Sequence, residues 1–238
     1  MVTTDGIVLS TIRYSDSSVI AKIYTEKSGL GSFMVRTGSG KKALTKLAIL
    51  QPLSLVELTY RNDDRKGIHS PHTLERSKSL NAIPFETVKT CIALFMAEII
   101  SRSIHEEEQN QPLFQFLRNA ILMLDDSAES CSNFHLKFMV EFSSHLGFYP
   151  SHFSGETYFD LYEGEFSNAQ PIHAHYTEGA ATAKLAEIIS ISMSEHHLVS
   201  MGSTLRRTLL QKLIDFFRLH LDGMKELRSH KVLEEVLA

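Results

Sequence analysis

The chain has few cysteines and no long apolar run. Its two cysteines, Cys91 and Cys131, stand forty residues apart among 238 residues. This spacing excludes a disulfide framework and a CxxC metal or redox pair, so we expect no cofactor and no zinc held by cysteine. No stretch reaches the roughly 18 to 20 apolar residues of a membrane span, and residues 1–5 lack the basic start of a signal peptide. We therefore expect a cytoplasmic protein without a membrane partner.

The sequence also lacks the motifs that carry catalysis. No GxSxG motif and no spaced acid and base pair in a glycine-rich setting occur, so covalent or hydrolytic chemistry has no support. Residues 38–42 read GSGKK, but a GxxxxGK[ST] phosphate loop would need glycine at Val35 and a hydroxyl at Lys42. The segment from His105 shares only its first two letters with a HExxH zinc motif. We predict that the protein is not an enzyme.

The charge is divided unevenly along the chain. The whole sequence has 24 Lys and Arg against 28 Asp and Glu, a net charge of -4. Residues 1–80 hold twelve basic and seven acidic residues, or +5, which leaves twelve and twenty-one, or -9, for residues 81–238. A basic first third favours a polyanion as its partner, because phosphates respond to local charge. An uneven but merely solvated surface is the alternative.

The hydrophobic pattern before residue 80 predicts five strands. Short segments rich in Val, Ile, Leu, Tyr and Thr lie between turn residues. These segments span residues 7–13, 19–25, 30–36, 53–61 and about 68–74. We interpret residues 37–47 as a loop that ends, at most, in a helical turn. A basic five-stranded antiparallel unit of this size is typical of an OB-fold, and an SH3-like barrel is the alternative.

After Pro84 the apolar spacing changes to three and four residues, which predicts helices. The expected helices begin after Pro84, at Pro112, at Asn133, and near residues 180, 204 and 229. Gly147 is expected to end the third helix and Ser229 to cap the last. Residues 157–167 alternate like a small hairpin. We therefore predict an α+β protein with an OB-fold domain at 1–80 and a helical domain with a hairpin insertion at 81–238.

The ordered motifs resemble the RecO family of bacterial recombination mediators along nearly the whole chain. The segments that carry the resemblance are TDGIVL (4–9), RYSDSSVI (13–20), YTEKSGL (24–30), LFQFL (113–117), LMLD (122–125), NFHLKF (133–138), LGFYP (146–150) and LRSHKVL (227–233). Many RecO proteins carry a four-cysteine zinc ribbon after the LGF-P block. Residues 151–180 contain no cysteine here, so the chain resembles the zinc-free branch, with the 157–167 hairpin in place of the ribbon.

The resemblance implies a DNA repair and recombination protein that binds single- and double-stranded DNA without catalysis. It implies annealing of complementary strands covered by single-stranded DNA-binding protein. It further implies that RecR is a partner, that RecA is helped indirectly onto the strand, and that the protein joins the nucleoid during repair.

Basic residues of the N-terminal domain are the predicted DNA contacts. Backbone-directed binding needs Lys and Arg along one surface, and base stacking needs outward aromatic rings. The predicted DNA-binding cations are Arg13, Lys22, Arg36, Lys41, Lys42, Lys46, Arg61, Arg65 and Lys66. Tyr14, Phe33 and Tyr60 are the candidate stacking rings, although Phe33 fits a core position better.

The helical domain is expected to bind the acidic, apolar C-terminal tail of single-stranded DNA-binding protein, as the resemblance implies. Such a tail needs an apolar groove with one or two cations at its rim. The predicted peptide-binding residues are Arg118, Lys137, Arg206 and Arg207, each of which could instead lie at the edge of a buried stripe.

Two other hypotheses remain. A metal-dependent enzyme could place His152, His173 and His175 around an ion in the helical domain. A protein-interaction scaffold would bind other proteins and no DNA.

Overall fold

A computed structural model describes residues 1–38, 41–63, 67–105 and 107–238, with only the backbone given for Lys41 and Lys42. The chain divides into two compact units. The barrel unit contains residues 1–86 and 93–125, and the helical unit contains residues 87–92 and 126–238. The barrel unit thus includes part of the helical sequence as well as the strands.

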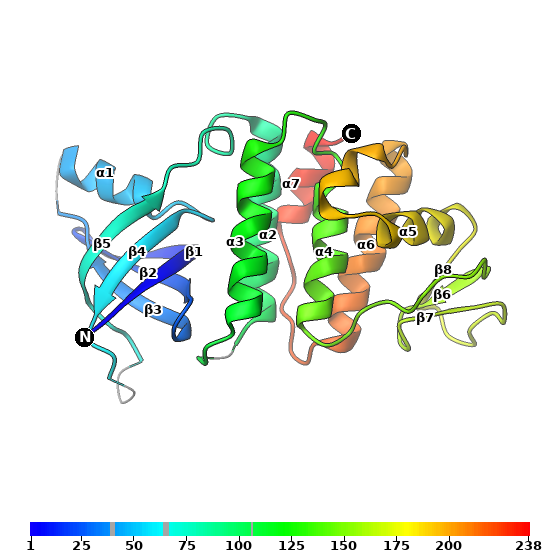
Figure 1. The fold of residues 1–238 in the computed structure, drawn as a ribbon, viewed down its shortest axis with the longest axis horizontal. Coiled ribbons are helices and arrows are strands. Elements are labelled where there is room, and N and C mark those ends of the chain that lie inside the picture. Colours follow the sequence, from blue (N-terminus) through cyan, green and yellow to red (C-terminus); the bar gives the residue numbers. More distant parts are fainter. Residues whose placement is uncertain (39–40, 64–66, 106) are drawn as a thin grey trace. The chain divides into compact units, whose positions relative to one another are not determined.

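Five antiparallel strands form the sheet of the barrel unit (Figure 1). They are β1 (Val2–Ser15), β2 (Ser18–Thr25), β3 (Gly29–Arg36), β4 (Leu55–Tyr60) and β5 (Pro71–Lys78), in the order β3-β2-β1-β4-β5. His69, which lies just before β5, bridges to β3, the strand at the other end of the sheet. Its carbonyl accepts from the Met34 N–H at 2.8 Å, and its N–H donates to the Ser32 carbonyl at 2.9 Å. The result is the predicted five-stranded, partly open barrel of the OB-fold type.

The barrel interior follows from alternation along the strands. Val19, Ala21 and Ile23 of β2 point inward and are buried, as are Phe33 and Val35 of β3. These inward residues form one core with others from the neighbouring strands and from the end of α1. The remaining core members are Val8, Leu50, Val56, Leu58 and Tyr60. β1 begins at Val2, five residues earlier than its apolar pattern predicts.

The segment predicted as a loop contains a helix, α1 (Lys41–Ile49). Leu47 and Ile49 of this helix pack against the barrel core, and Leu50 directly after it is buried. Leu47 and Leu50 are three residues apart, a spacing that places apolar side chains on one face of a helix, where they can pack against a core. Gly38 precedes it with a φ of 75°, a left-handed conformation that glycine adopts without strain.

Two further helices begin where the sequence predicts. They are α2 (Thr87–Ser103) and α3 (Gln111–Asp126). α3 packs against the barrel, because the Phe114 ring lies 6.2 Å from the Tyr24 ring and Gln115 donates to Glu26 at 2.9 Å. Among the described residues, no helix is long and apolar enough to cross a membrane.

The helical unit is built around α4. Its helices are α4 (Phe134–His145), α5 (Ala180–Ser190), the 3-10 helix η1 (Met193–Leu198), α6 (Ser203–His220) and α7 (Ser229–Val236). α4 contacts α5, α6 and η1. Gly147 follows α4 with a φ of 90°, as expected of a helix-ending glycine. The predicted cap at Ser229 is wrong, because Arg228 occupies the N-cap position and no side-chain cap bond forms.

The predicted hairpin is confirmed and gains a third strand. β6 (Tyr158–Asp160), β7 (Glu165–Ser167) and β8 (Tyr176–Glu178) form a sheet in the order β7-β6-β8. Phe159 is fully buried, and its ring lies 4.8 Å from Phe166 and 5.7 Å from Phe216 of α6. Apolar packing therefore orders this segment.

Candidate nucleic-acid interface

The outer face of β2 and β3 carries two of the predicted cations. Lys22 pairs with Ser32, and Arg36 pairs with Ser18, on neighbouring strands. Because the alternate residues such as Val19 point into the core, Lys22 and Arg36 project outward on one face. Along β3, the position of Ser32, which pairs with Lys22, lies four residues or about 13 Å from Arg36. OB-folds bind oligonucleotides on the face of these two strands.

An apolar row lies between these two cations. Ile12, Ile20 and Met34 pair across β1, β2 and β3, and we call these three residues the outer row. Ile12 is 65% exposed, and Tyr14, two residues further along β1, is 63% exposed. Apolar and aromatic surface flanked by cations is the chemistry that single-stranded nucleic acid requires, because bases stack and phosphates pair with charge.

The outer row was not among the predicted site residues. The register of β1 against β2 shifts between Val8 and Ser10, so the extra residue Leu9 changes which side chains face outward. Val8 points into the core, whereas Ile12 points outward. Three consecutive apolar residues from Ile7 are the only sequence signal of this bulge.

A groove of about 510 Å³ adjoins the outer face. Arg36 and Lys46 line it together with the apolar residues Met34, Ile49 and Leu74. The Lys46 ammonium donates to the Arg36 carbonyl at 2.7 Å, which brings α1 and the end of β3 together. Arg36 and Lys46, two of the predicted DNA-binding cations, therefore lie beside one groove.

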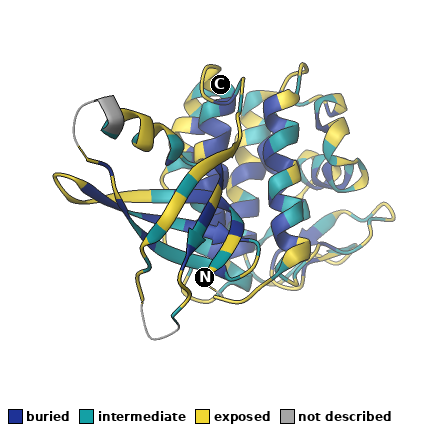
Figure 2. Cartoon of the chain, turned by 60° about the vertical axis from the view of Figure 1, so that its left-hand side comes forward, coloured by how far each residue is buried: buried dark blue, intermediate teal, exposed yellow. Residues whose placement is uncertain are grey.

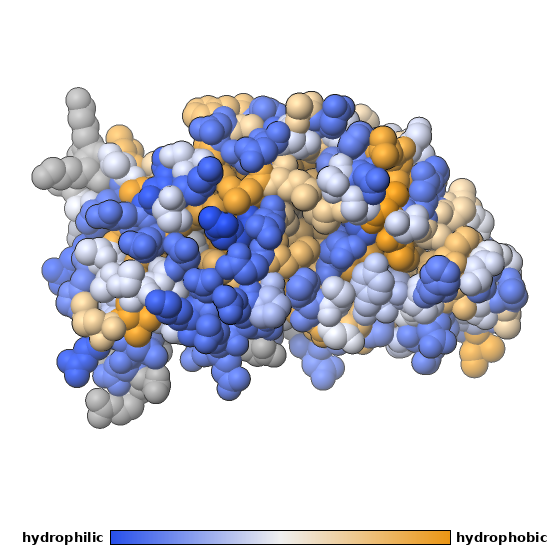
Figure 3. Space-filling view, in the orientation of Figure 1, coloured by the Kyte–Doolittle hydropathy of each residue, from blue (hydrophilic) through white to orange (hydrophobic). Residues whose placement is uncertain are grey.

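Two of the other predicted DNA-binding cations, Arg13 and Arg61, are exposed in the barrel unit. Arg13 is exposed near the β1–β2 turn and pairs with Asp16 at 3.0 Å. Arg61 is exposed just after β4. Lys41 and Lys42 begin α1, and their side chains are not described. Arg65 and Lys66 lie outside the described residues. On the face shown in Figure 3, hydrophilic residues cover most of the strands of the barrel unit.

Of the three candidate stacking rings, only Tyr14 is exposed. Phe33 and Tyr60 are each 1% exposed, and their rings meet edge to face at 5.0 Å. The His69 ring lies 5.2 Å from Tyr60 and 5.8 Å from Phe33. The expectation that Phe33 belongs to the core is confirmed, and Tyr60 also lies in the core and offers no ring face to a base.

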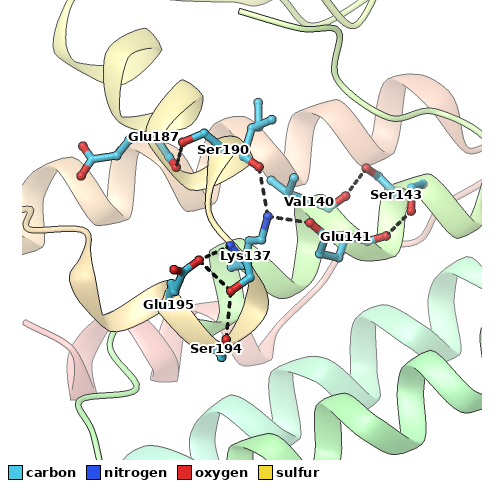
Figure 4. Close-up of polar contacts among 11 residues, drawn as sticks. Lys137, Val140, Glu141, Ser143, Glu187, Ser190, Ser194 and Glu195 are labelled. Atoms are coloured by element: carbon cyan, nitrogen blue, oxygen red, sulfur yellow. Dashed lines mark hydrogen bonds and ion pairs between the residues drawn. The ribbon is translucent and has the colours of Figure 1, made fainter.

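Lys137 lies inside the helical unit and not at a groove rim. Its side chain is 1% exposed. The ammonium donates to the Ile189 carbonyl at 3.1 Å and pairs with the Glu141 carboxylate at 2.5 Å (Figure 4). A buried ammonium with two internal partners has a structural role, because breaking such a pair leaves an uncompensated charge. The structure therefore does not support Lys137 as a peptide contact.

Arg206 is also occupied by internal partners. Its guanidinium donates to Asn133 Oδ1 at 3.0 Å, to the Leu237 carbonyl at 3.1 Å and to the Met201 carbonyl at 3.1 Å. Asn133 in turn donates to the Val199 carbonyl at 2.6 Å. These bonds connect the starts of α4 and α6 with the end of α7. Arg206 therefore holds helix ends together.

The two remaining peptide candidates keep solvent access. Arg207 is 53% exposed at its side chain and lies 3.5 Å from Glu234. Arg118 is partly exposed on α3. The two lie in different units, so we treat them as separate candidates.

The helical unit also has an apolar groove of about 710 Å³. Tyr149 and Phe153 line one part of it, and Ala183 and Ala186 of α5 line another. The charged residue of its lining is Glu187, and no Lys or Arg among the described residues lines it. Its chemistry does not match an acidic tail.

The histidines proposed for a metal site stabilise a loop instead. His173 Nε2 lies 3.1 Å from Asp160, and the His175 N–H donates to His173 Nδ1 at 3.2 Å. Both rings pack edge-on against Tyr162. His152 lines the apolar groove. Within the described part of the chain, no three His, Cys, Asp or Glu residues are grouped to hold a metal ion.

Two buried histidines in the helical unit have strongly lowered pKa values. Burial, with the positive charge of Arg206 and the nearby His196, lowers the pKa of His135 from 6.5 to about 3. Burial, with His197, lowers the pKa of His196 from 6.5 to about 4. Desolvation disfavours the imidazolium, so both rings are neutral in the folded protein near neutral pH.

Comparisons with known proteins agree over almost the whole chain. The family "Recombination protein O N terminal" matches residues 1–79, and "Recombination protein O C terminal" matches residues 84–230. A relative from Bacteroides fragilis is 36% identical over 239 residues, covering 98% of each chain. One from Phocaeicola vulgatus is 32% identical over 240 residues, and one from Flavobacterium psychrophilum is 36% identical over 246 residues. The alignments cover 99% of this chain and 98% of each of these two relatives.

All three relatives have the name DNA repair protein RecO. The first match spans all five strands of the barrel unit, and the second runs from the start of α2 to the beginning of α7. The identity and the coverage together show that the chain belongs to the RecO family of recombination proteins.

Proposed function

We propose that this chain is a non-catalytic recombination mediator that acts by binding DNA. In this proposal it binds single- and double-stranded DNA, anneals complementary strands covered by single-stranded DNA-binding protein, and acts with RecR to help RecA replace that protein. The observation that carries the proposal is the outer face of the barrel, where Lys22 and Arg36 flank the outer row. Membership of the RecO family supports the repair and recombination role.

The outer face suits a strand that is bound without regard to sequence. Lys22, Arg36 and Lys46 are cations that pair with phosphates on any sequence, and Tyr14 offers a ring to any base. Annealing requires a strand to be held by its backbone while its base edges stay available to a complement. A surface that binds phosphates and stacks bases, without reading their edges, meets this requirement.

The test is a titration of labelled single-stranded DNA at several salt concentrations. The double variant Lys22→Ala/Arg36→Ala should bind all sequences more weakly. Its slope of log K against log salt should flatten by about 1.4, which corresponds to two lost phosphate contacts on a single strand. The matched control is Lys225→Ala/Lys231→Ala, which removes two exposed cations from the helical unit and should leave the slope unchanged. Equal slopes for the first variant and the wild type would remove the outer face from the site.

Base stacking has its own test at Tyr14. Tyr14→Ala should weaken binding of single strands by about 1–3 kcal/mol, the usual contribution of a stacked base, and Tyr14→Phe should keep the affinity. Double-stranded DNA should bind all three proteins alike, because its bases are already stacked. Equal losses for single- and double-stranded DNA would indicate a backbone contact in place of stacking.

We further propose that Arg118 or Arg207 receives the acidic tail of single-stranded DNA-binding protein. Both side chains reach solvent, whereas Lys137 and Arg206 have internal partners. A fluorescent tail peptide should bind the wild type, and Arg118→Ala or Arg207→Ala should weaken it because a cation that pairs with the carboxylates is lost. Unimpaired binding by both variants would reject these two residues. A protein that binds the peptide but no DNA would instead be an interaction scaffold.

A further inference from the structure

The last part of β1 has a strand on one side only. β2 pairs with β1 as far as Ser15, whereas β4 pairs with it only from Val2 to Ile7. Val8 makes the last contacts on the β4 side, donating to the Ser54 carbonyl at 3.0 Å and accepting from Leu53 at 2.7 Å. Among the described residues, no strand pairs with residues 10–14 on this side, and we call them the open edge. The exposed residues of this projecting hairpin are yellow in Figure 2.

The directions of the backbone groups at the open edge follow from the register. The Met34 N–H donates to His69, so it points away from β2. Met34 and its pair partner Ile20 are therefore not hydrogen-bonded to each other, so the N–H and carbonyl of Ile20 point away from β3 and toward β1. On β1, Ile20 pairs with Ile12. Ile12 therefore directs its N–H and carbonyl at β2. Its neighbours Thr11 and Arg13 direct theirs at the open edge, because direction alternates along a strand.

We infer that a second copy of this chain pairs along the open edge, antiparallel, with Ile12 of both copies on the two-fold axis. In this register Thr11 of one copy pairs with Arg13 of the other. Each of these two pairs exchanges both of its backbone hydrogen bonds, so four bonds join the copies. The two Ile12 residues form a close pair without hydrogen bonds between them, with Cα atoms about 4.5 Å apart.

The side chains favour this register over its neighbours. An axis at Arg13 would place two guanidinium groups directly opposite each other, which is destabilising. An axis at Thr11 would place Arg13 opposite Leu9, where the bulge interrupts the ladder. With Ile12 on the axis, no like charges are opposed, and Tyr14 lies opposite Ser10. The edge is therefore self-complementary, as a two-fold interface requires.

Pairing would also extend the outer row. The row of one copy, Met34 to Ile20 to Ile12, would continue into the Ile12, Ile20 and Met34 of the second copy. Ile12 is 65% exposed in the single chain, and the Ile12 side chain of the second copy would pack beside it on the same face. Apolar cross-strand neighbours stabilise antiparallel pairs.

A two-fold axis through paired antiparallel edges stands perpendicular to the sheet, so both outer faces lie on the same side. Resting on the proposed function, this arrangement gives the dimer two adjacent DNA-binding faces. Two complementary strands would then be held side by side with their backbones bound. The inference therefore assigns the oligomeric form that anneals DNA.

The interface is short, so the dimer should form weakly and depend on concentration. Sedimentation velocity of the full chain, without DNA, should show a shift from monomer to dimer as concentration rises. Amide hydrogen exchange at Thr11 and Arg13 should slow over the same range, because their N–H groups become bonded. A monomer at every concentration would overturn the inference. So would a rate of hydrogen exchange at these two amides that does not change with protein concentration.

Two variants test the edge itself. Thr11→Pro removes an edge-facing N–H from each copy and leaves the β2 ladder intact, which edge strands tolerate. Two lost hydrogen bonds should weaken the dimer about thirtyfold. Ile12→Lys places like charges on the axis and should abolish the dimer, whereas Ile12→Val should keep it. A dimer unaffected by both Thr11→Pro and Ile12→Lys would overturn the assignment to this edge.

DNA binding separates this inference from the proposed function. Lys22→Ala should weaken DNA binding and leave the dimer intact. Thr11→Pro should bind single strands like the wild type but anneal complements more slowly. A dimer in a chain that binds no DNA would refute the proposed function and support the inference, whereas normal annealing by a monomeric Thr11→Pro would overturn the claim that the dimer anneals.

Discussion

Replacing Asp125 with alanine should loosen the point where the chain leaves the barrel for α2. The Asp125 carboxylate at the end of α3 is buried and accepts three successive backbone N–H groups. It accepts from Asn81 at 2.7 Å, from Ala82 at 2.8 Å and from Ile83 at 2.8 Å. These bonds fix the segment before α2 to the end of α3, within the barrel unit.

The expected loss can be worked from these three bonds. A hydrogen bond to a charged group contributes about 1.5–3 kcal/mol, and each buried donor left unsatisfied costs about 1–3 kcal/mol. Water reaches the segment once the carboxylate is gone, because Asn81 is exposed. We therefore expect Asp125→Ala to lower the free energy of unfolding by about 3–5 kcal/mol. Asp125→Asn keeps one acceptor oxygen and should lose roughly half as much.

Urea unfolding of the full chain, followed by circular dichroism, measures the loss. Amide hydrogen exchange at residues 81–83 gives a local reading that does not depend on two-state behaviour. Asp126→Ala is the matched control, because Asp126 is exposed at the next position and should change the stability by no more than about 0.5 kcal/mol. A loss below about 1 kcal/mol for Asp125→Ala, with unchanged exchange at 81–83, would refute the reasoning.

Three further results are expected. Lys41→Ala/Lys42→Ala should weaken binding to all DNA sequences alike and flatten the salt slope by up to about 1.4, and an unchanged slope would remove the start of α1 from the site. Excess EDTA should leave the thermal melt unchanged, whereas a drop of several degrees would show that histidines hold a metal. Because His135 and His196 have pKa values of about 3 and 4 in the fold and 6.5 when unfolded, the unfolded chain binds more protons at acid pH. The free energy of unfolding should therefore be at its full value above pH 6.5 and fall toward pH 4 by up to about 1.4 kcal/mol per pH unit and per histidine. In urea titrations, His135→Gln should reduce this fall, whereas replacing the exposed His72 with Gln should not. A stability that does not change with pH would contradict the burial of these rings.

Local pattern was a sufficient guide to most of the elements. The bounds of β2 and β3 differ by no more than one residue from the segments that period-two alternation predicts. Pro112 lies at a helix start and Gly147 follows a helix end, as expected. These signals are local, because alternation and capping depend on neighbours a few residues apart. The helix at residues 41–49 departs from the prediction, since its stability comes from Leu47 and Ile49 packing on a core that other segments form.

Candidate site residues were harder to predict than elements. Composition singled out the basic N-terminal third, and Arg36 and Lys46 indeed lie together. Helix position alone could not separate Arg207, which reaches solvent, from Lys137, whose ammonium is buried against the Ile189 carbonyl and Glu141. The difference depends on Ile189 of α5, which is 52 residues away from Lys137 in the sequence.

The sequence by itself determined the family, most of the strand and helix order and the charge of each part, because these depend on residue identity and short-range spacing. The tertiary structure alone decided which groups are available. The bulge at Leu9 turns Ile12 outward, and the end of the β4 pairing leaves Thr11 and Arg13 with open backbone groups. Such features depend on the register between strands far apart in the chain, and a one-residue shift in register exchanges the buried and exposed faces.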